Sequence, residues 1–124
     1  MKKVFYNKLV RDGIKEKIEK NGESCEVREI TDEEELQQEL LKKVTEEASA
    51  LSRVSSRDEF LEEYADLMVA LDALTALMEF SEADIRTALT ENVAKKGLYK
   101  KKHFLYWSDA GNYKSNETPQ GIQK

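Results

Sequence analysis

The chain has 124 residues, of which 40% are hydrophobic and 36% charged, and its formal net charge is −5. This length is typical of one domain that can bury a core. The acidic balance argues against a protein that binds nucleic acid nonspecifically. A single cysteine excludes a disulfide within the chain, and the N-terminus lacks the pattern of a signal peptide. We therefore expect a cytoplasmic protein.

The N-terminal part is expected to contain a short helix and then an extended segment. The helix runs from about Lys8 to Lys20 and is closed by Asn21-Gly22. Residues 24–30 alternate in the manner of a strand, and a lone strand needs a partner. The segment 103–107 is the only plausible internal candidate, so a short β pairing between the two segments is expected.

Three longer helices follow, over 32–54, 57–79 and 82–97. Each start is marked by a hydroxyl residue three positions before a carboxylate, which is typical of a capping box or, in the third case, of a looser variant; the hydroxyl residues are Thr31, Ser56 and Ser81. The sequence therefore predicts an all-α fold, an antiparallel bundle of three main helices plus the short N-terminal helix. We expect one domain over residues 1–108 and a polar, flexible tail over 109–124.

The first long helix carries an acid on its apolar face. Its apolar residues share one arc, as expected of a stripe that faces the core: Leu36, Leu40, Val44, Leu51 and Val54. Glu47 falls inside this arc, whereas Glu46 points about a quarter-turn away. A carboxylate in such a place is costly unless it is paired or binds a metal.

The second long helix carries two further acids. From Tyr64 to Met78 it is apolar nearly all round, which predicts burial nearly all round, yet Asp66 interrupts it. Glu63 lies one turn earlier on the same face. Antiparallel packing would bring Glu47 to these two acids, and such a set of hard oxygen ligands suits Mg²⁺, or Mn²⁺. The alternative is that these acids are merely solvated, and for Asp72 a structural role such as pairing with a lysine is favoured.

Four stretches resemble a subgroup of predicted house-cleaning enzymes among the MazG-like and phosphoribosyl-ATP pyrophosphohydrolase-like proteins. The opening of that subgroup, Y-N-K-L-V-R-D-x-I, is similar to residues 5–14. Its two carboxylate motifs, K-L-x-E-E-x-x-E-L and E-E-x-A-D, are similar to residues 43–51 and 62–66. Its closing K-x-R/K-G-x-F-like segment is similar to residues 94–99. The resemblance covers most of residues 5–107 in the same order.

The resemblance implies an all-α, Mg²⁺-dependent hydrolase that splits a nucleoside triphosphate into a monophosphate and pyrophosphate. It implies that Glu47, Glu63 and Asp66 bind the metal and are catalytic. The subgroup's second glutamate would fall at Ala50, where it is absent. This departure supports an alternative, a degenerate relative that is weak or inactive and binds a nucleotide or a protein partner.

Basic residues near the C-terminal end are candidates for the triphosphate. Lys95 and Lys96 belong to a local lysine cluster, and Asn92 lies one turn earlier, where it would hydrogen-bond the nucleotide. Lys8 and Arg11, in the opening motif, are further candidates for phosphate contacts, although that motif equally suits helix packing or a subunit interface.

Apolar residues that a thin bundle leaves uncovered, such as Phe60, Leu77 and Leu89, predict packing against a second copy. The resemblance likewise implies a homo-oligomer, a dimer or a tetramer. No membrane partner is expected, because the longest apolar stretch is too short and too charged for a span. The remaining alternative is a helical interaction module without a small-molecule ligand.

Overall fold

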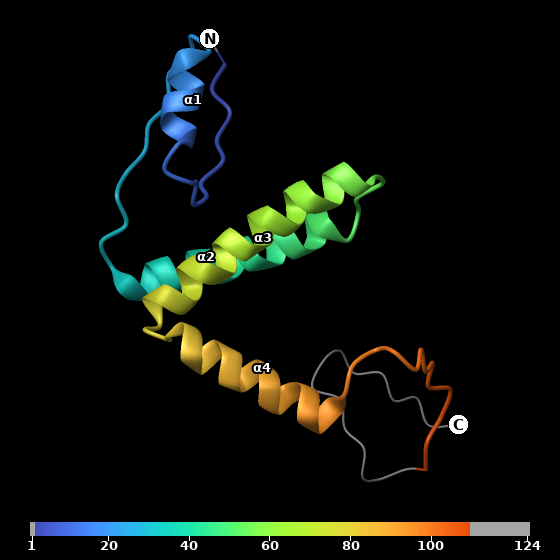
Figure 1. The fold of residues 1–124 in the computed structure, drawn as a ribbon. Coiled ribbons are helices and arrows are strands. Elements are labelled where there is room, and N and C mark those ends of the chain that lie inside the picture. The colour runs from blue at the N-terminus through green and yellow to red at the C-terminus, as the bar shows by residue number, and fades with distance from the viewer. Residues whose placement is uncertain (1, 110–124) are drawn as a thin grey trace. The chain divides into compact units, whose positions relative to one another are not determined.

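The computed structural model describes residues 2–109. The fold in this range is all-helical, as predicted, with α1 (Ile14–Lys20), α2 (Glu33–Leu51), α3 (Arg57–Leu77) and α4 (Glu82–Lys96) in chain order (Figure 1). The chain divides into two compact units, Met1–Ile85 and Arg86–Lys124, and α4 crosses the division. The single domain over residues 1–108 stays a prediction. Apart from its first residue, Asp109, the predicted tail lies outside the described residues.

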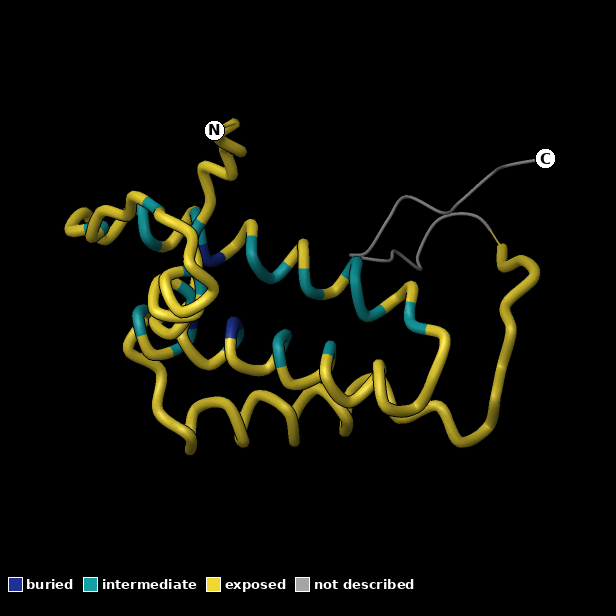
Figure 2. The backbone as a smooth tube through the Cα atoms, turned by 90° about the horizontal axis from the view of Figure 1, so that it is seen from above, coloured by how far each residue is buried: buried dark blue, intermediate teal, exposed yellow. Residues whose placement is uncertain are grey.

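In the first unit, α2 and α3 form an antiparallel hairpin (Figure 1). Their buried and half-buried positions face each other across the seam between the helices (Figure 2). The most buried residues at this seam are Leu40 from α2 and Ala70 and Leu74 from α3. Each of the three is at most 9% exposed. The predicted apolar stripe is confirmed for the four of its residues that α2 contains, which are all buried or half-buried, whereas the fifth, Val54, is half-buried but lies beyond the end of the helix.

The outer surface of α3 is exposed, so the prediction of burial nearly all round is wrong. Tyr64 is 47% exposed, and Met68 and Val69 are also exposed. The physical reason is that α2 covers only one face of α3, and α1 packs on neither helix within residues 2–85. A large apolar area is therefore left without a partner inside this unit.

The predicted capping boxes form at two of three helix starts. At α4, Ser81 Oγ accepts a bond from the amide of Asp84 (3.1 Å), and Asp84 Oδ2 accepts one from the amide of Ser81 (2.9 Å). At α3, Ser56 Oγ accepts from the amide of Glu59, whose carboxylate reaches the amide of Ser55. The box at Thr31 is wrong, since Asp32 takes the cap position of α2 without a side-chain bond.

The N-terminal segment is less regular than predicted. The first helix begins at Ile14 instead of Lys8, because Gly13 disfavours a helix and Asn7 has a positive φ of 47°. The β pairing is also wrong, since neither 24–30 nor 103–107 forms a strand and no strand occurs in residues 2–109. Alternation of residue types without a ladder partner does not make a strand.

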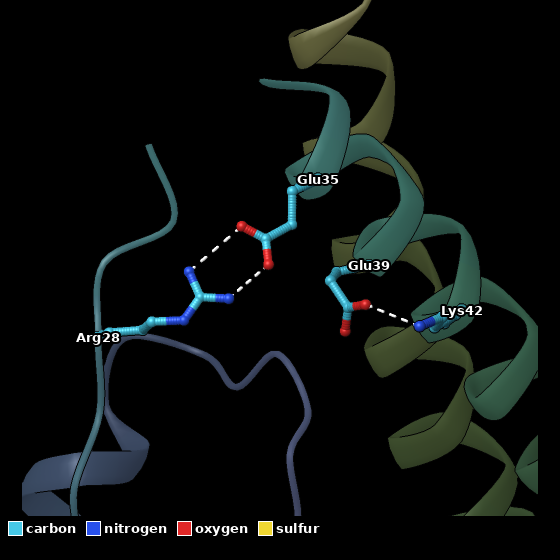
Figure 3. Close-up of polar contacts among 4 residues, drawn as sticks. All are labelled: Arg28, Glu35, Glu39 and Lys42. Atoms are coloured by element: carbon cyan, nitrogen blue, oxygen red, sulfur yellow. Dashed lines mark hydrogen bonds and ion pairs between the residues drawn. The ribbon is translucent and has the colours of Figure 1, made fainter. Parts of the chain in front are cut away.

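An arginine–glutamate pair ties the extended segment to the start of α2. Arg28 donates two bonds to the carboxylate of Glu35, one of them 3.2 Å long (Figure 3). One turn further along α2, Lys42 pairs with Glu39 at 2.9 Å (Figure 3). The bond from Arg28 holds the pKa of the Glu35 carboxyl below its usual value, and the same bond raises the pKa of Arg28.

The stabilisation from Glu35 is expected to depend on pH. Because its pKa is lower in the folded chain, its contribution is present above the ordinary value of 4.5 and is lost as the pH falls through the folded value. Glu35→Gln should therefore lower the melting temperature more at about pH 7 than at about pH 3. Glu34→Gln is the control, since Glu34 takes part in none of the ion pairs among the described residues. Thermal melts of equal shift at both pH values for Glu35→Gln would contradict this role of the pair.

None of the helices in residues 2–109 combines the length and the apolar character that a membrane span requires.

Candidate metal centre

Three acids from the two hairpin helices converge at the seam. Glu47 lies on the core-facing stripe of α2, and Glu63 and Asp66 lie one turn apart on the facing side of α3. All three are half-buried. The antiparallel arrangement brings Glu47, near the end of α2, to the first half of α3 because the connecting loop is short. The sequence prediction that these three residues meet is confirmed.

One carboxylate oxygen from each acid lies within 4.8 Å of the others. Mg²⁺ binds oxygen at about 2.1 Å, so two oxygens on one ion stand at most about 4.2 Å apart. Only one pair of the three oxygens can stand that far apart on an octahedral ion, since neighbouring ligands are about 3.0 Å apart, so the side chains would have to rotate toward one another to bind one ion. The donor set is three hard oxygens with partial solvent access, which fits Mg²⁺ or Mn²⁺ with water completing the shell.

The cluster is electrostatically strained when all its members are ionised. Partial burial raises the pKa of the Glu47 carboxyl, and the nearby charge of Asp66 raises it further. The ammonium of Lys43, one turn before Glu47, acts in the opposite direction, while Glu63 adds a smaller upward effect. A divalent cation between these carboxylates would remove the repulsion that raises this pKa.

Position 50 limits the number of protein ligands. Ala50 is half-buried on α2, close to one turn after Glu47, and has no polar side chain. Glu46 does not take its place, because its carboxylate pairs with Lys43 at 3.1 Å and it is not one of the three converging acids. The centre therefore offers three carboxylates.

An arginine from the N-terminal segment reaches the cluster. Arg11 Nη1 lies 3.1 Å from Asp66 Oδ1, and the two side chains are 61% and 41% exposed. Sequence reasoning placed Arg11 among the phosphate ligands and missed this partner. The two residues are 55 positions apart, so no local spacing signals the contact. The role of Lys43 beside Glu47 was also missed, although the spacing of four on one helix could have indicated it.

The other predicted substrate residues belong to the N-terminal segment and to α4. The ammonium of Lys8 stands 5.5 Å from the centre of the Tyr6 ring, a cation–π contact. Asn92, Lys95 and Lys96 are exposed residues of α4 in the second unit, and the two lysines belong to its last turn. Their contact with a nucleotide stays a prediction.

Comparisons with known proteins returned no match: no family model, no curated protein and no solved structure is similar to the chain. The resemblance drawn from the opening motif and the carboxylate motifs therefore stays a prediction.

Proposed function

We propose that the chain is a cytoplasmic, Mg²⁺-dependent nucleoside triphosphate pyrophosphohydrolase. The observation that carries the proposal is the convergence of Glu47, Glu63 and Asp66 across the α2–α3 seam, half-buried and within 4.8 Å of one another. Three like charges at a partly desolvated place oppose folding, which is reasonable where they serve a ligand. The reaction class, hydrolysis of a nucleoside triphosphate, comes from the resemblance of the carboxylate motifs.

The proposed reaction adds one water across the anhydride bond between the α- and β-phosphates, giving a nucleoside monophosphate and pyrophosphate. Glu47, Glu63 and Asp66 would hold the cation at the seam. Bound Mg²⁺ supplies Lewis acidity, lowers the pKa of a coordinated water and neutralises charge on the leaving pyrophosphate. The lysine cluster and the resemblance add Lys95 and Lys96 as proposed sources of positive charge toward the phosphates, and Asn92 as a proposed hydrogen-bonding residue for the nucleotide.

A homo-oligomer belongs to the same proposal. The outer side of the hairpin exposes large apolar side chains, including Leu41 (47%), Phe60 (45%), Leu61 (64%) and Tyr64 (47%). Only three residues of the described chain are buried apolar ones. A second copy packed on this surface would supply the core that one hairpin lacks.

Release of pyrophosphate tests the proposal. A panel of standard and modified nucleoside triphosphates is incubated with the chain, with and without Mg²⁺, and pyrophosphate is quantified. We expect release from at least one nucleotide that disappears when Mg²⁺ is removed. Release that is independent of the metal, or absent with every nucleotide while the folded chain binds no divalent cation, would contradict the proposal.

Ala50 favours the second candidate, a degenerate relative that binds the nucleotide without turning it over. The two candidates separate through Ala50→Glu, which adds a fourth carboxylate close to one turn after Glu47. If the native chain binds the nucleotide and is inactive, and this variant releases pyrophosphate, the chain is a degenerate relative. Turnover by the native chain excludes this candidate.

A further inference from the structure

The contact between Arg11 and the carboxylate cluster places a cation of the protein at the proposed site of a metal. Arg11 precedes α1, and its carbonyl accepts a bond from the amide of Ile14 (3.1 Å), so its backbone is held in the turn that starts this helix. Its side chain, in contrast, is 61% exposed and rests on Asp66 by a single ion pair of 3.1 Å. The guanidinium can therefore leave Asp66 by rotation of its own side chain, without a change in the buried seam.

A divalent ion and the guanidinium of Arg11 compete for the same carboxylate. An ion held by Glu47, Glu63 and Asp66 would stand within a few ångströms of this guanidinium, because the two share Asp66. Like charges at that distance repel each other. An exposed ion pair is weak, whereas the ion is attracted by three carboxylates at once. The ion is therefore expected to displace the guanidinium of Arg11 from Asp66.

We propose that Arg11 is an exchangeable placeholder: it holds Asp66 in the metal-free chain, leaves when the divalent ion enters, and then binds an oxygen of the phosphate group that accompanies the ion. The inference rests on the proposed function for the metal and the phosphate. Guanidinium carries paired N–H donors in a plane, which match the oxygens of a phosphate. In the metal-free chain, the positive charge of Arg11 is paired with Asp66. In the chain with bound ion, the same charge faces the phosphate of the substrate.

The exchange predicts opposite effects of one substitution on two ligands. In Arg11→Gln, Mn²⁺ alone should bind about two- to fivefold more tightly, because no pair must be broken. Inorganic pyrophosphate, added with saturating Mn²⁺, should bind about tenfold more weakly, because a charge-assisted contact is lost. A purely structural role for Arg11 would not give changes of opposite sign. Electron paramagnetic resonance of free Mn²⁺ and calorimetry with pyrophosphate measure the two affinities.

Arg28→Gln is the matched control, since it also removes an arginine–carboxylate pair, at Glu35. It should leave both affinities unchanged.

Three outcomes would overturn the exchange. They are an unchanged or weaker Mn²⁺ affinity in Arg11→Gln, an unchanged pyrophosphate affinity, and the same changes in Arg28→Gln. If the native chain binds Mn²⁺ and the Asp66→Asn variant does not, any of these three outcomes contradicts the exchange alone and leaves the proposed function standing. If the native chain binds no Mn²⁺, the exchange and the proposed function fall together.

Discussion

Replacing Asp66 with asparagine is expected to reduce Mg²⁺-dependent release of pyrophosphate by about 100-fold or more. Asp66 belongs to the three converging carboxylates, and loss even of a group that only supports a metal ligand costs about 10- to 100-fold. Asparagine keeps the shape of the side chain and removes its charge, so the change isolates the interaction with the cation. The measurement is the initial rate of pyrophosphate release at saturating Mg²⁺, on protein whose helix content is verified by circular dichroism.

Asp72→Asn is the control for this experiment. Asp72 lies on the same helix and is exposed, outside the three converging acids. It should retain the native rate. A rate for Asp66→Asn within about twofold of that of Asp72→Asn would show that Asp66 does not hold a catalytic cation.

The second large effect concerns the seam between α2 and α3. Leu40→Ala is expected to lower the free energy of unfolding by about 2–3 kcal/mol, because it deletes one of the most buried side chains and leaves a cavity. The measurement is urea denaturation followed by circular dichroism. The hairpin has so few buried residues that this loss removes a large part of its core.

Leu41→Ala provides the matched control, with the same substitution one residue along α2. Leu41 is 47% exposed, so its truncation should cost less than about 1 kcal/mol at low protein concentration. A cost that grows with protein concentration would indicate that a second copy covers Leu41, as proposed above. Equal losses for the two variants in dilute solution would contradict the observed orientation of α2.

The main helices could be predicted because their signals are local. α2, α3 and α4 begin within one residue of the expected positions and end at most three residues early, at Leu51 instead of 54. Ser56 and Ser81 accept the amide bonds that their spacing predicts. The stripe on α2 also fixed which of its faces meets α3, since apolar periodicity reports the buried side of a helix directly.

The failures arise where a local pattern needs a distant partner. The alternation in 24–30 found no second strand, and the apolar surface of α3 around Tyr64 found only one covering helix in the first unit. Composition shows that a segment would benefit from burial, but it does not show what covers it. The cap at α2 failed for a simpler reason, because Thr31 and Asp32 are both good cap residues and Asp32 takes the position.

The candidate site divides in the same way. The convergence of Glu47, Glu63 and Asp66 follows from two helix faces and one short loop, all readable in the sequence. The pair between Arg11 and Asp66 depends on where an irregular N-terminal segment meets α3, and no periodicity encodes such a contact. The residues of α4 named as phosphate ligands were chosen from charge and resemblance, and only an experiment on nucleotide binding will test them.

The most direct test of the cation site is a titration of the native chain and of Asp66→Asn with Mn²⁺, followed by electron paramagnetic resonance. We predict at least one bound ion for each native chain, and loss of most of this binding in the variant. A native chain that binds no ion, or a variant that binds Mn²⁺ as tightly as the native chain does, would contradict the assignment of the three carboxylates as a metal centre.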